Sequence, residues 1–92
     1  MAKLSKDDIQ LKLSHVFGWQ LDGNSIYKEF NFKDFKESLN FINKVGDEAE
    51  KMDHHPDINL HSYNKVKLVL STHSEGGLTN KDFKLAEIIN NF

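Results

Sequence analysis

The chain has 92 residues, 38% of them hydrophobic and 28% charged, an ordinary balance for one folded domain spanning residues 1–92. Its formal net charge of −2, with both signs interspersed, argues against a nucleic-acid-binding surface. The lack of cysteine excludes disulfides, thiolate catalysis and cysteine-ligated zinc, and the lack of a long apolar run or leader predicts a cytoplasmic protein with no membrane partner.

The first part of the chain predicts a helix followed by a β-hairpin. Ser5 and Asp8 are spaced as a capping box, so the helix should begin there and run to about His15. The turn sequence DGNS then separates a short strand from an alternating strand over residues 26–32. Lys28 interrupts the apolar face of that strand, which makes the alternation imperfect.

The apolar spacing changes to that of a helix from Lys33 onward. Residues that recur at three- and four-residue steps form the predicted inward stripe: Phe35, Leu39, Ile42, Val45, Ala49 and Met52. Phe41 lies off this stripe and Gly46 removes a side chain from the helix surface, which indicates a second packing face. A core this small gains from association, so we expect the helix from about Lys33 to Met52 to lie in an oligomer interface.

A second hairpin and a third helix are predicted from Pro56 onward, because proline disfavours helix for the residue before it. The second strand of this hairpin alternates, and one of its faces would carry Val66, Leu68, Leu70 and Thr72. A Gly-Gly pair ends the strand, and Thr79 with Asp82 forms another capping box. The order α-β-β-α-β-β-α predicts an α+β fold, with a four-stranded antiparallel sheet covered on one face by three helices.

Three of the five histidines are the candidate catalytic residues. His54 and His55 are adjacent and precede a proline, whereas His73 ends the alternating strand just before the Gly-Gly loop. Imidazole is the side chain whose ordinary pKa lies nearest physiological pH, so a group of three indicates general acid–base catalysis without a cofactor. His15 and His61 are expected to be surface or satisfied polar residues.

Other uses of these histidines explain the pattern less well. A cationic imidazole suits a helix C-terminus, but that accounts for only one of the adjacent pair. Three histidines match the ligand count of some catalytic zinc sites, yet neighbours such as His54 and His55 project in different directions, so we predict no metal. Ser71 and Ser74 lie near His73 without a G-x-S-x-G elbow, and no phosphate-loop motif follows the glycines. Proton transfer on a bound neutral molecule remains.

The same region contains a dense set of motifs that continues upstream. In chain order these are Gly18-Trp19, Phe30-x-Phe32-Lys33-Asp34-Phe35, Glu50-x-x-x-His54-His55-Pro56, Tyr63-Asn64-Lys65-Val66, Ser71-Thr72-His73, Gly77-Leu78-Thr79 and Asp82. The set resembles pterin-4a-carbinolamine dehydratase over nearly the whole chain. The resemblance implies three helices on a four-stranded antiparallel sheet, and a homodimer or homotetramer, the latter assembled through the long helix.

The resemblance also implies an activity, that of a hydro-lyase. The reaction would dehydrate 4a-hydroxytetrahydrobiopterin, or a related pterin, to the quinonoid dihydropterin, and would thereby recycle tetrahydrobiopterin used by an aromatic amino-acid hydroxylase. The substrate is a hemiaminal, from which water leaves carbon 4a when the hydroxyl is protonated and nitrogen 5 gives up a proton. One imidazolium donor and one neutral imidazole acceptor suffice, so no cofactor is implied.

Position by position, the resemblance makes His54, His55 and His73 the catalytic group. The residues implied to border the pterin or support these imidazoles are Trp19, Glu50, Pro56, Thr72, Ser74, Glu75 and Asp82. Glu50 is one helical turn before His54 and is placed to orient an imidazole. Asp82 is explained equally well by its capping box, and Trp19 by an ordinary place in the core.

A binding or assembly protein of the same fold is the alternative hypothesis. Such a protein would use the face of its long helix as a docking surface and would have no need of three convergent imidazoles. Animal members of the family often carry an aromatic residue where this chain has Ile58, and the loop to Tyr63 is one residue longer here. This difference argues against the second role of the animal proteins, as a dimerisation cofactor for a homeodomain transcription factor.

Overall fold

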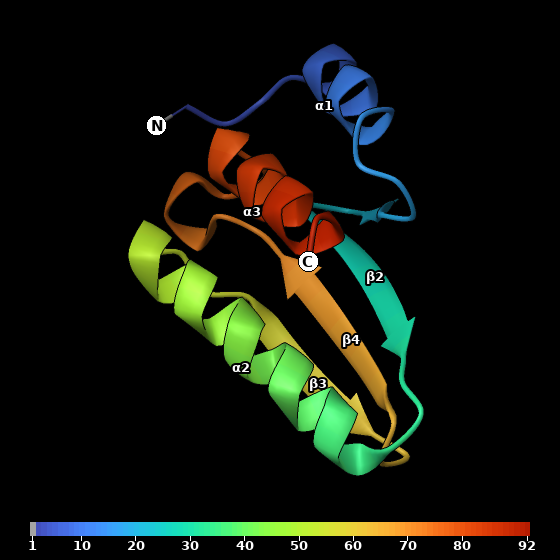
Figure 1. Ribbon diagram of the computed structural model, residues 1–92. Coiled ribbons are helices and arrows are strands. Elements are labelled where there is room, and N and C mark those ends of the chain that lie inside the picture. Colours follow the sequence, from blue (N-terminus) through green and yellow to red (C-terminus); the bar gives the residue numbers. More distant parts are fainter. Residues whose placement is uncertain (1) are drawn as a thin grey trace.

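The computed structural model describes residues 2–92, and it confirms the predicted α+β order (Figure 1). The helices are α1 (Lys6–Leu13), α2 (Phe35–Met52) and α3 (Asn80–Asn90). The strands are β1 (Gln20–Asp22), β2 (Ser25–Asn31), β3 (Asp57–His61) and β4 (Lys65–Leu70), and β4 is followed by a single 3-10 turn, η1 (His73–Glu75). Within the described range, no helix combines the length and the apolar character that crossing a bilayer requires.

The four strands form one antiparallel sheet in the order β1-β2-β4-β3. β4 is central to the fold because it pairs with both β2 and β3, with Val66 opposite Phe30 on one side and Leu60 on the other. Helices α2 and α3 lie across one face of this sheet, and α1 packs at the end nearest β1 (Figure 1). The two hairpins are thus joined side by side, and the loop after β4 returns toward the end of α2.

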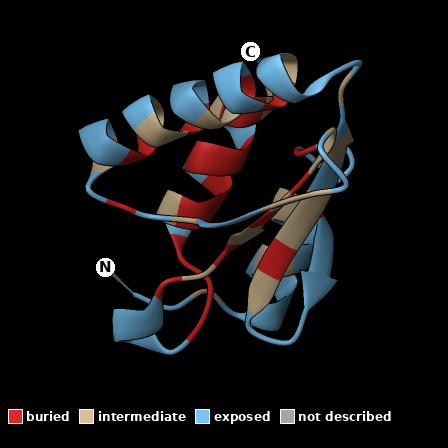
Figure 2. Cartoon of the chain, turned by 90° about the horizontal axis from the view of Figure 1, so that it is seen from below, coloured by how far each residue is buried: buried red, intermediate tan, exposed pale blue. Residues whose placement is uncertain are grey.

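The alternation read in β4 is confirmed by its burial. Val66, Leu68 and Leu70 are fully buried, whereas the residues between them are only partly covered. A strand directs successive side chains to opposite faces, so one face of β4 forms the floor of the core. Leu85 and Ile89 of α3 pack onto this floor, and Figure 2 shows buried residues concentrated on α3 and on the inner side of α2.

The inward face predicted for α2 is confirmed at Val45 and Ala49 but is wrong in the first half of the helix. The buried residues of the helix are Ser38, Phe41, Val45 and Ala49. Phe41 packs against the rings of both Phe30 and Phe32, with centroid distances of 4.7 and 4.9 Å. Ser38 permits a close approach, and its hydroxyl donates to the Asp34 carbonyl at 3.1 Å.

The rotated face of α2 leaves apolar residues in solvent. Phe35 and Leu39, both expected inside, are 50% and 39% exposed. Ile42 is half-buried, and Gly46 and Ile58 border a shallow depression of about 340 Å³ beside it. Phe35 and Leu39 therefore form an exposed apolar face of α2, whereas Phe41, which was expected to mark a second face, belongs to the core.

Lys28 faces inward on β2 and finds partners there. Its Nζ donates to the Phe17 carbonyl and to Asn90 Oδ1, each at 2.9 Å, and lies 5.0 Å from the centre of the Phe30 ring. Burial lowers the pKa of Lys28 below its ordinary value. The same Asn90 oxygen accepts from Trp19 Nε1 at 3.0 Å, so these contacts bind β2 to the end of α3.

Candidate active site

The backbone at the end of α2 directs the side chain of His54 into the protein interior. Asp53 caps the helix in the left-handed conformation, with a φ of 49°, and the chain then enters Pro56 and β3. His54 is only 8% exposed as a result, and its Nε2 lies 2.6 Å from Oδ1 of Asp82, which is fully buried. With Nε2 donating to the carboxylate, the imidazole of His54 is held in one orientation, and Nδ1 is the ring nitrogen that takes no part in this bond.

Asp82 forms the predicted capping box and also contacts His54. Its Oδ1 accepts from His54, while its Oδ2 accepts from the Thr79 backbone N–H at 3.0 Å and completes the predicted capping box of α3. Oδ2 also accepts from the Thr72 hydroxyl at 2.8 Å. Because Thr72 uses its proton there, the Thr79 hydroxyl, 2.8 Å away, donates to Thr72. The carboxylate is thus held from several directions.

The loop that carries His73 is fixed to this network. Thr72 N donates to the Gly77 carbonyl at 3.0 Å, and Gly77 N donates to the Thr72 carbonyl at 3.3 Å, which closes residues 72–77 into a compact turn. Gly76 adopts a φ of 71°, a conformation that side chains disfavour. His73 directly follows Thr72, so the Thr72–Asp82–His54 bonds hold the His73 loop close to His54.

His55 and its neighbours form the exposed side of the site. The Nε2 of His55 lies 3.6 Å from Oε2 of Glu50, and both side chains are largely in water. Glu50 is therefore beside His55, and the contact is weak because solvent screens it. Pro56 is half-buried next to His55. Ser74 and Glu75, with His73, are exposed on the 3-10 turn, which leaves them accessible to a ligand.

Trp19, which was a predicted site residue, lies apart from His54, His55 and His73, and so do the other two histidines. Trp19 is a core residue, with its ring edge-on to Phe30 at 6.3 Å and its N–H on Asn90, at the opposite end of α3 from Asp82. His61 pairs with Glu29 at 3.0 Å on the outer face of the sheet. His15 lines a groove between α1 and α3, together with lysines that no sequence motif brought together.

The described residues also bear on metal binding. Across residues 2–92, no group of three or more histidine, aspartate or glutamate side chains is arranged to hold a metal ion. His54 has its Nε2 on Asp82 and His55 is beside Glu50, so the three histidines do not share one point of coordination. The arrangement suits proton transfer between separate imidazoles and a bound molecule.

Comparison with known proteins decides the family. The profile of the pterin 4 alpha carbinolamine dehydratase family matches residues 2–92. The chain belongs to this family. A relative from Sulfolobus acidocaldarius is 49% identical over 88 residues, which cover 96% of each chain, and one from Nostoc sp. is 49% identical over 90 residues, covering 97% of this chain and 96% of the relative. Both are named provisionally as pterin-4-alpha-carbinolamine dehydratases.

Solved structures agree with the family assignment. The transcriptional coactivator/pterin dehydratase from Brucella melitensis superposes with a TM-score of 0.90 and 38% identity, over 97% of this chain and 96% of that one. A pterin dehydratase-like protein identified as a RuBisCO assembly factor has a TM-score of 0.64, with 79% of this chain and 83% of that one covered. At 19% identity, the second likeness shows the fold alone.

Proposed function

We propose that the chain dehydrates a pterin 4a-carbinolamine, 4a-hydroxytetrahydrobiopterin or a related pterin, to the quinonoid dihydropterin and water. The observation that carries the proposal is the 2.6 Å hydrogen bond from buried His54 to Asp82, beside the exposed His55 and His73. A buried carboxylate that fixes one imidazole next to two accessible ones is a device for directed proton transfer. Membership of the pterin dehydratase family supports the choice of substrate.

The proposed reaction needs one proton donor and one proton acceptor. The acid protonates the 4a-hydroxyl, the C4a–O bond breaks, and water leaves. The base takes the proton from nitrogen 5, whose electron pair forms the C4a=N5 double bond. His55 and His73 are the accessible imidazoles and take these two roles, while His54, fixed by Asp82, positions the substrate and the neighbouring ring.

The remaining site residues shape the surroundings of the pterin. Glu50 lies beside His55 at the edge of the site, and Pro56 stiffens the backbone that carries both adjacent histidines. Thr72 holds the network, while Ser74 and Glu75 border the substrate from the 3-10 turn. No step of this mechanism requires a metal ion or a redox cofactor. A separate two-electron reduction of this product would regenerate the tetrahydropterin that an enzyme such as an aromatic amino-acid hydroxylase consumes.

A homodimer or homotetramer is part of this proposal. Phe35 and Leu39 expose apolar side chains along α2, and Ile58 of β3 lies beside the same face at 39% exposure. Burial of such a patch against a second copy would remove its contact with water, at roughly 25 cal/mol per Å² of apolar surface. The symmetric partner of a helix face is most simply the same face of another subunit.

A binding or assembly protein is the second candidate, and the same exposed face of α2 favours it. Phe35, Leu39 and Ile58 would then contact a different protein, and the histidines would have no chemical task. The buried His54–Asp82 bond favours the enzyme, because a docking scaffold gains nothing from orienting an imidazole beside two others.

The deciding experiment is a direct dehydration assay. The carbinolamine is generated in situ, and its disappearance is followed by absorbance with increasing amounts of protein. The enzyme proposal requires a rate that rises in proportion to protein and falls in the His73→Ala variant. No acceleration over the spontaneous loss of water, from folded protein, would reject the enzyme in favour of the binding protein.

A further inference from the structure

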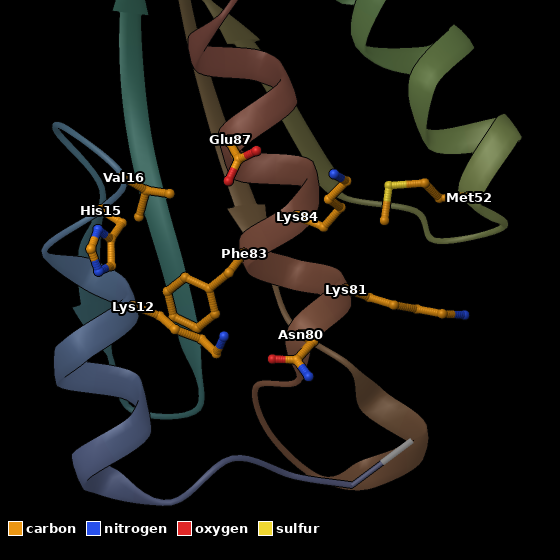
Figure 3. A pocket seen from close by; sticks show the side chains of 9 residues that line it. All are labelled: Lys12, His15, Val16, Met52, Asn80, Lys81, Phe83, Lys84 and Glu87. Carbon is orange, nitrogen blue, oxygen red and sulfur yellow. The ribbon is translucent and has the colours of Figure 1, made fainter.

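A groove lies between α1 and α3 (Figure 3). Its volume is about 510 Å³, within the range of small-molecule sites. Val16 of the segment after α1 and Phe83 of α3 are buried and form an apolar floor, and Met52 closes the side at the end of α2. Asn80 and Glu87 complete the lining on α3.

Positive charge surrounds this groove. Lys12 lines it on the α1 side, and Lys81 and Lys84 line it from α3, where their side chains extend toward the end of α2; Glu87 is the single carboxylate of the lining. Within residues 2–92, Lys51 is the only lysine in an ion pair. The three lysines of the groove therefore have no acidic partner. The whole chain has a net charge of −2, so this local excess is not a general property of the surface. Ammonium groups that line one groove without an acidic partner favour an anion there.

The groove adjoins the candidate active site. Met52 lines it and is two residues before His54, and Lys81 lines it and directly precedes Asp82, the partner of His54. In a pterin, nitrogen 5 is bonded to both carbon 4a and carbon 6. A substituent on carbon 6 is therefore attached next to the bond that changes during dehydration. In a pterin bound at the histidines, this substituent would lie within reach of the groove.

We propose that the groove binds the substituent on carbon 6, and that the natural substrate is a reduced pterin whose substituent ends in a phosphate or a carboxylate. The inference rests on the proposed function and specifies its substrate class. The apolar floor of Val16 and Phe83 contacts the linking atoms, and Lys12 and Lys84 bind the anion. A neutral dihydroxypropyl substituent would leave the ammonium groups without a partner.

Binding of matched pterins tests the anion directly. Neopterin and neopterin 3′-monophosphate differ only in the phosphate, and 6-hydroxymethylpterin and 6-carboxypterin form the corresponding carboxylate pair. Each is titrated against the wild-type chain by pterin fluorescence. Of the two anionic pterins, we expect the one that binds more tightly to exceed its neutral partner in affinity by about tenfold in about 0.01 M salt. This difference in affinity should shrink in about 0.5 M salt. Equal affinities within both pairs at low salt would overturn the inference.

Lysine variants then test the location. Lys12→Gln and Lys84→Gln should each reduce the preference for the anion, and the double variant should abolish it, while affinity for the neutral partner stays unchanged. Lys33→Gln removes the same charge from an exposed site before the opposite end of α2 and should keep the full preference. A double variant that retains the wild-type preference would place the anion elsewhere and reject the groove.

Turnover separates this inference from the proposed function. Dehydration of the neopterin and neopterin monophosphate carbinolamines at equal kcat/KM would uphold the dehydratase and reject the anionic substituent. A higher kcat/KM for the phosphorylated substrate, lost in Lys12→Gln/Lys84→Gln, would support both. Tighter, lysine-dependent binding of the phosphate without turnover of either compound would reject the dehydratase and retain the groove as an anion site.

Discussion

His54 donates from Nε2 to Oδ1 of Asp82 across 2.6 Å, between residues 28 positions apart in the sequence. The other oxygen of the same carboxylate caps α3 through the Thr79 N–H. One buried side chain therefore begins a helix and orients an imidazole at the end of another helix. The position of His54 depends on the start of α3, so stability and site geometry are coupled at this carboxylate.

Asp82→Asn should weaken both functions of that carboxylate. The amide can occupy the same volume, but it presents one acceptor atom to the three groups that now donate to two oxygens. We expect a loss of about 1–3 kcal/mol in the free energy of unfolding, measured in urea. As a positioning residue for His54, Asp82 should also affect kcat more than KM, by roughly 10- to 100-fold.

Thr79→Ser is the matched control for Asp82→Asn, since serine keeps the hydroxyl and the backbone N–H of the cap. It should retain kcat within the error of the assay. Wild-type kcat in a less stable Asp82→Asn protein would show that the carboxylate is structural only.

His55→Ala and His73→Ala should each lower kcat/KM in the dehydration assay. A positioned acid or base is worth roughly 10²–10⁴-fold, and the low end is expected here because the hemiaminal also loses water unaided. The double variant should lose less than the product of the single effects, because the two residues act on one reaction. His61→Ala is the control, since His61 is distant from the site and paired with Glu29 on the sheet surface.

Small and equal losses in His55→Ala, His73→Ala and His61→Ala, all folded by circular dichroism, would contradict the assignment of the site. The exposed face of α2 would then become the main candidate for function, as a docking surface.

Removal of metal ions should leave the dehydration rate unchanged. The histidines do not converge on one point, and proton transfer between imidazole and substrate is sufficient. The protein is dialysed against a chelator and assayed before and after. Loss of activity on dialysis, with recovery on addition of zinc, would require the acid–base mechanism to be abandoned.

Sedimentation equilibrium at micromolar concentration should give a multiple of the 10.6 kDa chain mass, with a tetramer as the expected species. Leu39→Lys places a charge on the exposed apolar face of α2 and should shift the protein to smaller species without unfolding it. Asn40→Lys adds the same charge to an adjacent exposed position and should not. A wild-type sample containing only the monomer would refute the interface.

The partly buried Lys28 should make stability depend on pH in the alkaline range. Burial lowers its pKa in the folded chain below the ordinary 10.5, so between these two values the unfolded chain binds more protons. The free energy of unfolding contributed by Lys28 should therefore rise with pH across that window. Urea unfolding of the wild type and of Lys28→Met, at about pH 7 and about pH 10, measures the difference. A difference that falls as pH rises would contradict the assigned direction.

Local rules were enough to derive much of the fold from the sequence. The alternation of Val66, Leu68 and Leu70 predicted the buried face of β4, because side chains of a strand alternate whatever lies above them. The capping box of Thr79 and Asp82 predicted the start of α3, because all of its atoms lie within one turn. The three histidines could be chosen as candidates for the same reason, since their chemistry and motif spacing are properties of the chain.

Only the tertiary structure decided which groups meet. The inward face of α2 includes Phe41 because its ring packs against Phe30 and Phe32, a contact that no periodicity within the helix encodes. The choice of His54 as the buried imidazole follows from Asp82, and the groove lysines meet because α1 packs beside α3. Periodicity and capping depend on near neighbours in the sequence, whereas these contacts depend on how complete elements pack together.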